Sequence, residues 1–458
     1  MNERNNERKN EGQVLGKGQR VLVRIEDIGA QGQGIGRVGG LVVFVPGTFP
    51  GDEVRVQITD VRKSYATAEL ESIVSPSTAR TDVLCPHAAV CGGCAFQGWS
   101  YDAQLAHKEE MVRETLRRIG GIEDPPVQPI LGMEHPFEYR NKAQFAVQKD
   151  DVGFYAPKSR DAFSITSCML QKPPAVALAK AFSSFLQEYP KNIYRHLIVR
   201  TATTGEVMAI LVANKDDVSH VETIAGRLDD AVADPWSLDS LILNVNKEAH
   251  RRVLGPENRT LAGAPVIRDA LQLKHATLAL EVSPASFYQV NPEQASRLYE
   301  QVFEYARLTG GETVLDLYCG AGSIGLSLAG YAGRVIGVES VRAAVLDANR
   351  NAVLNGIVNA EFIYGKAEEV VPKRLSGLRA DVVILDPPRQ GCAPGLLSAV
   401  SELQPERIVY VSCNPSTLAR DVSILTEQGY AMNEAQPVDM FPWTAHVETV
   451  VLMSRVKD

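Results

Sequence analysis

The sequence predicts a multidomain α/β protein that combines a small β-barrel, a mixed α/β central domain and a doubly wound α/β domain. With 458 residues, the chain is longer than one hydrophobic core usually organises. Short β-branched runs separated by glycines open the chain, and strands alternate with helices from about Gly311 onward. The expected parts are a disordered tail over 1–14, the barrel over 15–73, the central domain over 74–282 and the doubly wound domain over 283–458.

Composition narrows the class of protein. The 45% hydrophobic and 22% charged content is typical of a soluble globular protein. No apolar run reaches the roughly 18 residues of a membrane span, and the polar start is unlike a signal peptide, so we expect a cytoplasmic protein without a membrane partner. No feature indicates a protein partner. The net charge of −8 argues against nucleic-acid binding unless basic residues gather on one face.

The barrel is expected from β-branched runs at 21–28, 32–38, 41–47 and 51–70. An amphipathic helix is expected over 101–120, ending at a glycine pair. The central region mixes strands and helices without a clear period. Within it, residues 137–160 alternate aromatic side chains with basic side chains, which include Arg140 and Lys142. Aromatic rings can stack on RNA bases while the cations hold phosphates, although a solvated strand face is an equally good interpretation.

Three cysteines share one short glycine-containing segment, Cys85, Cys91 and Cys94, and Cys168 is available as a fourth ligand. The chain holds seven cysteines and no secretion signal, which favours metal ligands or reactive thiols over disulfides. Four thiolates suit tetrahedral zinc or a [4Fe–4S] cluster. Spacing alone does not decide between them, and zinc is the more common occupant.

The doubly wound domain is expected from six apolar runs at 313–318, 334–340, 360–365, 381–388, 407–413 and 446–453. Ligands of such sheets sit at the carboxyl ends of the strands. Gly320, Gly322 and Gly325 follow the first strand as G-x-G-x-x-G, and Glu339 ends the second, where a ribose-binding carboxylate is expected. This pattern serves nicotinamide cofactors and S-adenosylmethionine alike. The Asp-Pro-Pro after the fourth strand, beginning at Asp386, favours a methyltransferase.

A thiol follows the fifth strand. Cys413 precedes Pro415, which suits a first helical position, so the thiol is expected beside a positive helix end that favours the thiolate. Methylation of C5 in a uracil requires covalent addition at C6, for which cysteine is well suited. Glu448, near the start of the last strand, is a candidate base for the C5 proton. The alternatives are an inert buried cysteine and a surface glutamate.

These motifs together resemble the RNA uracil-C5 methyltransferase family, which makes 5-methyluridine in ribosomal and transfer RNA. The start of the chain resembles the TRAM domain, an OB-like barrel found on RNA-modifying enzymes. The matching segments are DLYCGAGSIG, DPPRQG, SCNP and HVE. The resemblance implies a Rossmann-like methyltransferase domain in which Cys413 is the nucleophile and Glu448 the proton-abstracting base.

The resemblance also implies which residues contact the RNA, an iron–sulfur cluster and S-adenosyl-L-methionine. Phe287 would stack on the target base. Family members with this cysteine spacing are iron–sulfur proteins, so the resemblance reverses the preference for zinc and implies a [4Fe–4S] cluster on the four cysteines. The implied contacts to S-adenosyl-L-methionine are Gln289, Tyr318, Gly320, Gly322, Glu339 and Asp386.

The sequence therefore predicts an S-adenosylmethionine-dependent methyltransferase that acts on C5 of a uridine in structured RNA, 23S ribosomal RNA being the expected substrate. The T-loop uridine of transfer RNA is the alternative in the same class, but enzymes of that kind often lack the TRAM domain and the cysteine segment. An iron–sulfur oxidoreductase would leave SCNP and HVE unused. A non-enzymatic iron–sulfur RNA-binding protein would not need Cys413, Glu448, Asp386 and Gln289 together.

Overall fold

The structure is a computed structural model that describes residues 15–157, 159, 161–190, 192–217, 219–248 and 252–456. The predicted tail over 1–14 lies outside the described residues, as do Lys158 and Arg160 of the aromatic and basic stretch. In the described part of the chain, no helix combines the length and the hydropathy needed to cross a membrane. The chain forms two compact units, Met1–His107 with Phe441–Ala445, and Lys108–Met440 with His446–Asp458.

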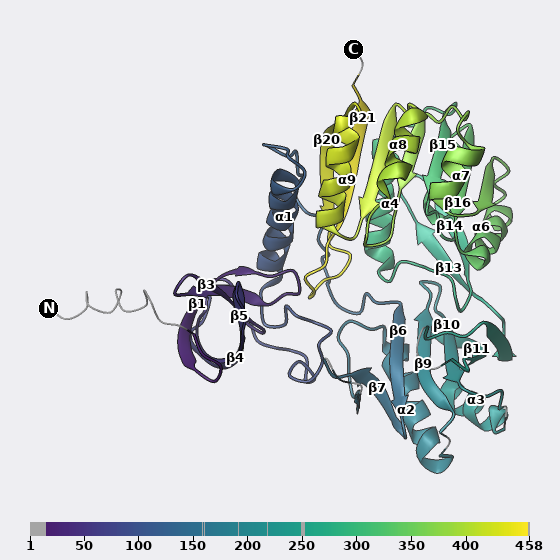
Figure 1. The fold of residues 1–458 in the computed structure, drawn as a ribbon. Helices are drawn as coiled ribbons and strands as arrows, with labels where there is room; N and C mark the ends of the chain where they lie inside the picture. Colours follow the sequence, from purple (N-terminus) through teal and green to yellow (C-terminus); the bar gives the residue numbers. More distant parts are fainter. Residues whose placement is uncertain are drawn as a thin grey trace. The chain divides into compact units, whose positions relative to one another are not determined.

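A closed five-stranded barrel occupies the first unit (Figure 1). Apolar side chains at alternate positions of the first and fourth strands are buried inside it, as the period of two requires. Four strand pairs are antiparallel, and β3 closes the barrel by pairing parallel to β5. The strands are β1 (Arg20–Ile28), β2 (Gly34–Val38), β3 (Leu41–Val45), β4 (Glu53–Val61) and β5 (Tyr65–Ser75).

The cysteine segment follows the barrel and is built from turns. Backbone hydrogen bonds from Ala88 to Cys85 and from Cys91 to His87 tighten its first half. Nearby, the rings of Phe49 and Trp99 stack with centroids 5.2 Å apart. Phe96, two residues after Cys94, belongs to the same small buried cluster.

Only the part of the predicted central domain from Lys108 onward belongs to the second unit, where it forms a seven-stranded sheet in the order β12-β11-β10-β9-β6-β7-β8. All neighbouring pairs are antiparallel except β10 and β11. The strands are β6 (Lys142–Gln148), β7 (Asp151–Tyr155), β8 (Ala162–Ser164), β9 (Tyr194–Thr201), β10 (Glu206–Ala213), β11 (Ser237–Val245) and β12 (Glu257–Gly263). The helices are α2 (Pro173–Glu188) and α3 (Val221–Asp230), and α1 (Tyr101–Arg118) precedes the sheet along the chain.

A hairpin of β13 (Ile267–Gln272) and β14 (Thr277–Val282) leads into the last sheet (Figure 1). The strand order of that sheet is β17-β16-β15-β18-β19-β21-β20. Its strands are β15 (Thr313–Leu317), β16 (Arg334–Glu339), β17 (Ala360–Tyr364), β18 (Val382–Leu385), β19 (Arg407–Ser412), β20 (Tyr430–Val438) and β21 (Glu448–Arg455). The helices are α4 (Pro292–Ala306), α5 (Ser323–Leu328), the 3₁₀ turn η1 (Ala329–Tyr331), α6 (Arg342–Leu354), α7 (Ala367–Arg374), α8 (Pro394–Glu402) and α9 (Pro415–Glu427).

This topology confirms the predicted doubly wound domain. Five strands are parallel, and the strand order reverses between β15 and β18, which is where such sheets bind ligands. β21 runs antiparallel to β19, so its first residue lies beside the end of β19. The edge strand β20 was not predicted, because its polar residues and Pro437 are unusual in a strand.

Candidate active site

The glycine loop follows β15, and its backbone has conformations that favour glycine. Gly320 and Gly322 have φ angles of 56° and 80°. A Cβ added at Gly322 would lie 2.8 Å from the Phe362 ring, whereas one at Gly320 would meet no atom within 4 Å. The loop is therefore packed against the domain on one side and open to a ligand on the other.

Asp316, a buried residue that the sequence analysis assigned no role, holds this loop in place. Its Oδ2 accepts a hydrogen bond from the Gly325 N–H at 2.9 Å. Its Oδ1 is buried without a hydrogen-bond partner among the described residues. Burial raises the pKa of Asp316 to about 8. A carboxylate inside an otherwise apolar strand was the signal that could have singled this residue out.

Glu339 ends β16, as predicted, and its carboxylate lies over the glycine loop. It accepts hydrogen bonds from the N–H of Gly320 at 3.1 Å and of Val341 at 2.6 Å. Tyr318 has a positive φ of 63°, and its hydroxyl donates to Glu368 at 2.7 Å. Both predicted cofactor residues therefore flank the loop that contains Gly320.

Gln289 belongs to the segment before α4 and is buried, with 7% of its surface exposed. Asn141 positions this segment through two hydrogen bonds of 2.9 Å. Its Nδ2 donates to the carbonyl of Gln289, and its backbone N–H donates to the carbonyl of Val290. Phe287 is 67% exposed. The role of Asn141 was not predicted, since its partner lies far away in the sequence.

Cys413 lies between β19 and α9 and is half-buried. Asn414 caps α9 by accepting a hydrogen bond from the Ser416 N–H at 3.2 Å, and Pro415 begins the helix. The predicted helix start beside the thiol is thus present.

Glu448 lies next to Cys413 across the sheet, because Ser412 on β19 pairs with Thr449 on β21. It is buried, with 5% of its surface exposed. Burial and the neighbouring Asp386 raise the pKa of Glu448 well above its usual range. The carboxyl is therefore a stronger base, once ionised, than an exposed glutamate.

Asp386 follows β18, and burial raises its pKa to about 7. Burial, Glu448 and Asp386 together raise the pKa of Cys413 to about 11, and Arg389 opposes them. In the protein without substrate, desolvation and two nearby carboxylates thus hold the pKa of the thiol above its usual value. The contribution of the helix end to this pKa stays a prediction.

The residues at this sheet edge fit S-adenosylmethionine. The open side of Gly320, the carboxylate of Glu339 over the loop and the half-buried Asp386 lie at the ends of three adjacent strands. Glycines permit close approach of a ligand, and a carboxylate at the end of the second strand can accept hydrogen bonds from ribose hydroxyls.

The two basic residues among the three predicted RNA contacts, Arg140 and Lys142, lie in the second unit, as Phe287 does. Lys142 begins β6 and is partly buried, and burial together with Arg200 lowers its pKa to about 8. Arg140 is partly exposed, and its carbonyl accepts a hydrogen bond from the Lys172 N–H.

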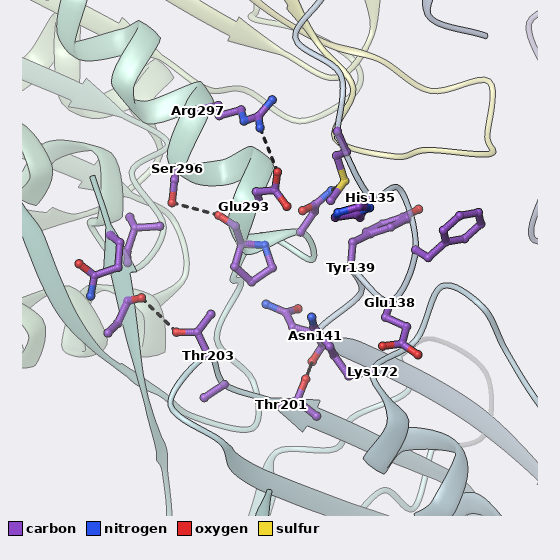
Figure 2. Close-up of a pocket in the computed structure, with 18 of the residues that line it drawn as sticks. His135, Glu138, Tyr139, Asn141, Lys172, Thr201, Thr203, Glu293, Ser296 and Arg297 are labelled. Carbon is purple, nitrogen blue, oxygen red and sulfur yellow. Dashed lines mark hydrogen bonds and ion pairs between the residues drawn. The ribbon is translucent and has the colours of Figure 1, made fainter. Parts of the chain in front are cut away.

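A pocket of about 790 Å³ is lined by Tyr139 and Asn141, the two neighbours of Arg140 in the chain (Figure 2). Phe137, Tyr139 and His135 contribute rings to its lining, and Lys172 and Arg297 contribute cations. None of the predicted cofactor residues lines it.

The four predicted cluster ligands fall in different units. Cys85, Cys91 and Cys94 belong to the first unit and Cys168 to the second. Within the described residues, no group of three or more His, Cys, Asp or Glu side chains is arranged to hold a metal ion.

Comparisons with known proteins agree with this fold. Residues 256–456 match the family model described as tRNA (Uracil-5-)-methyltransferase, and residues 15–70 match the TRAM domain. An uncharacterized RNA methyltransferase of Bacillus cereus is 41% identical over 96% of this chain and 98% of its own length. One of Caldanaerobacter subterraneus is also 41% identical, over 96% and 99% of the two chains.

Among solved structures, the tRNA (uracil-54, C5)-methyltransferase of Pyrococcus abyssi, in complex with S-adenosyl-L-homocysteine, is similar with a TM-score of 0.75 and 28% identity. The match covers 94% of this chain and 99% of that one. The fold, the strand-end site and these similarities lead to one conclusion. The chain belongs to the family of S-adenosylmethionine-dependent RNA (uracil-5-)-methyltransferases.

Proposed function

We propose that this enzyme makes 5-methyluridine through a covalent adduct between Cys413 and C6 of the target uracil. The observation that carries the proposal is the pairing of β19 with β21, which brings a thiol and a buried carboxyl together at the cofactor edge of the sheet. An addition at C6 and a proton removal at C5 need these two groups side by side.

Cys413 and Glu448 act in different steps of the proposed reaction. Cys413 loses its proton, and its sulfur bonds to C6, which moves the C5–C6 π electrons toward C5 and makes that carbon nucleophilic. S-adenosylmethionine supplies the methyl group as an electrophile on a sulfonium centre. Glu448 then takes the remaining proton from C5. That electron pair restores the C5–C6 double bond, and the C6–S bond breaks to release the thiolate.

The RNA would bind along the aromatic and basic stretch. Phe137, which is 37% exposed, offers a ring for base stacking, and the cation of Lys172 lines the same pocket (Figure 2). Arg140 and Lys142 would contact phosphates. A phosphate near Lys142 would favour its charged form against the burial that lowers its pKa.

For the substrate we propose a uridine of 23S ribosomal RNA, supported by the presence of both the TRAM domain and the cysteine segment. The T-loop uridine of transfer RNA is the second candidate. It is favoured by the similarity to the Pyrococcus abyssi enzyme over 94% of this chain.

Mapping 5-methyluridine in RNA from cells with and without the gene tests both substrates. We expect the modification to disappear from one or more 23S positions and to return with wild-type enzyme but not with Cys413→Ala. Loss confined to the T-loop would contradict the ribosomal substrate, and unchanged 5-methyluridine in both RNAs would contradict the function.

We further propose that Cys85, Cys91, Cys94 and Cys168 hold a [4Fe–4S] cluster with a structural role, since methyl transfer requires no electron. Protein purified without oxygen should be brown and absorb broadly at about 400 nm, and Cys91→Ser should remove the colour. Cys392→Ser, at a buried cysteine of the last domain, is the control that should keep it. Colourless wild-type protein with one equivalent of zinc would contradict the cluster.

A further inference from the structure

Asp439 directly follows the last residue of β20 and is buried, and it has no role in the reaction described so far. Its place in the chain is significant because β20 pairs antiparallel with β21, and the ladder partner of Val438 is Glu448. The Cα atoms of directly opposed residues in such a pair lie about 4.5–5.5 Å apart. Asp439 is therefore one residue away from the backbone that lies opposite the proposed base.

The backbone and the side chain of Asp439 are both held from outside these two strands. Its Oδ1 accepts a hydrogen bond from Lys108 Nζ on α1 at 2.5 Å. Its carbonyl accepts one from Gln294 Nε2 on α4 at 3.1 Å, and its N–H donates to the Leu131 carbonyl at 2.9 Å. Lys108 and Gln294 are both fully buried. Three segments that are distant in sequence thus meet at the end of β20.

The next residue, Met440, is held by the same helix start. Its carbonyl accepts a hydrogen bond from Asn291 Nδ2 at 3.2 Å, and its N–H donates to the Val438 carbonyl at 2.9 Å. Asn291 also caps α4, because its Oδ1 accepts from the Gln294 N–H at 3.3 Å. The first turn of α4 therefore holds two successive carbonyls at the point where the chain leaves β20.

The ion pair of Lys108 and Asp439 is costly to bury. Burial lowers the pKa of Lys108, and the charge of Asp439 opposes this effect. Desolvation offsets much of the attraction between two buried charges, and replacing such a pair by apolar residues of similar volume often leaves stability unchanged. The direction of the bond still selects one arrangement of the two side chains. Positioning therefore explains this pair better than stability does.

We propose that Lys108, Gln294 and Asp439 are positioning residues that fix the end of β20. Through the pair of Val438 with Glu448, they fix the carboxyl that removes the C5 proton. They act through the backbone and leave the bonds that form and break in the reaction unchanged. A displacement of about 1 Å at a reacting group can cost about 10² in rate, so a small shift of the strand end is sufficient. The role rests on the proposed function, in which Glu448 is the base.

Two steps followed on the same RNA test this role. Cells that lack the gene provide unmodified RNA with tritium at C5 of its uridines, and S-adenosylmethionine carries a radiocarbon-labelled methyl group. Radiocarbon in the RNA, free or bound to protein, measures methyl transfer. Tritium released to water measures proton removal from C5. In wild-type enzyme, the release of tritium should keep pace with methyl transfer.

Lys108→Met combined with Asp439→Leu removes both charges and nearly keeps the shapes of the two side chains. This double variant should transfer the methyl group at the wild-type rate but release tritium about 10–100-fold more slowly. Arg227→Met combined with Glu188→Leu removes an ion pair between α3 and α2 in the same way and is the matched control. Its tritium release should keep pace with methyl transfer.

A pair that only supports the fold would affect both steps together. Tritium release that keeps pace with methyl transfer in the folded double variant, at whatever rate, would therefore overturn the proposal. Thermal unfolding shows whether the variant is folded. If it is not, Gln294→Met carries the test, because it removes the donor to the Asp439 carbonyl without leaving a charge unpaired. It should also delay tritium release, and release without delay would overturn the proposal.

Amide hydrogen exchange separates this role from the methylation itself. In the double variant, or in Gln294→Met, amides over 438–448 should lose protection while those of β15 keep it. If they do so while wild-type enzyme methylates no RNA, the hold on the strand end stands and the proposed reaction fails. If Glu448→Gln delays tritium release but the positioning variants neither delay it nor lose protection, the reaction stands and the positioning role fails.

Discussion

The two seven-stranded sheets of the second unit differ in strand direction, and this difference explains where the proposed catalytic residues lie. In the last sheet, five parallel strands end at one edge, where Glu339, Asp386 and Cys413 gather. In the central sheet, five of the six neighbouring pairs are antiparallel, so successive strands end at opposite edges. Parallel strands thus concentrate side chains that are distant in sequence, whereas antiparallel strands disperse them.

The sheets also differ in the sign of their buried charges. Burial raises the pKa values of Asp316 and Asp386 in the last domain to about 8 and about 7. In the central sheet, burial lowers the pKa values of Arg200 and Lys142 to about 10 and about 8. The same desolvation penalty therefore favours the neutral form of the carboxyl groups in the last domain. In the central sheet, next to the expected RNA surface, it favours the neutral form of the basic side chains.

The largest expected effect comes from a glycine substitution that distorts the glycine loop after β15, where S-adenosylmethionine is expected to bind. Gly322→Ala places a Cβ 2.8 Å from Phe362 on backbone with a positive φ. It should lower the free energy of unfolding by about 1–3 kcal/mol and weaken binding of S-adenosylmethionine at least tenfold. Calorimetry measures both.

Gly226→Ala in α3 of the central domain is the control. Its Cβ would meet no atom within 4 Å, and a helix interior favours alanine by about 1 kcal/mol. Equal cofactor affinity for Gly322→Ala and wild type would contradict the packing argument for the loop.

The next effect concerns stability against pH. With its pKa raised to about 8, Asp316 binds a proton more tightly in the folded than in the unfolded protein. Its contribution to stability is complete below about pH 4 and is lost as the pH rises through about 8, at up to about 1.4 kcal/mol per pH unit. Asp316→Asn should remove this slope while keeping an acceptor for Gly325. Urea unfolding between pH 5 and 9 measures it, and equal slopes in both proteins would show that Asp316 is not the cause.

Lys142 should show the opposite sign. Its lowered pKa means that the folded protein disfavours the charged form, so stability is reduced at neutral pH and recovers as the pH rises from about 8 toward about 10.5. Lys142→Met should therefore stabilise the protein at pH 7 and lose this advantage by about pH 10.5. A stabilisation that does not vary with pH would indicate a packing effect instead.

The smallest expected effect is on RNA binding. If Arg140 and Lys142 contact phosphates, the logarithm of the RNA-binding constant should fall less steeply with the logarithm of the salt concentration once both are replaced by alanine. The magnitude of this slope should decrease by up to about two. Filter binding from 50 to 300 mM salt on a structured ribosomal RNA fragment measures the slope. Arg259→Ala, at an exposed residue of β12, is the control that should not change it. An unchanged slope for the double variant would assign the two residues to a solvated face.

The same difference between the sheets determined what could be predicted from sequence. Regular alternation of apolar strands and helices gave the fold of the last domain, and the strand ends gave the positions of Gly320, Glu339 and Cys413. The central sheet was not resolved into strands, because its long apolar runs have no clear period.

Other features depend on contacts that sequence spacing does not show. Asn141 positions the Gln289 segment from 148 residues away, and Arg389 reaches His446 over 57 residues. The raised pKa of Cys413 likewise follows from burial beside Asp386 and Glu448, which only the folded sheet reveals.

The covalent mechanism is tested most directly by trapping the enzyme on its RNA. Glu448→Gln should still add Cys413 to C6 and accept the methyl group at C5, but it lacks the base that removes the C5 proton, a loss worth about 10²–10⁴ in rate. After incubation with S-adenosylmethionine and substrate RNA, we expect a methylated protein–RNA complex that survives denaturing electrophoresis. The complex should be absent with Cys413→Ala. Absence of the complex with Glu448→Gln, together with full activity of Cys413→Ala, would contradict the account.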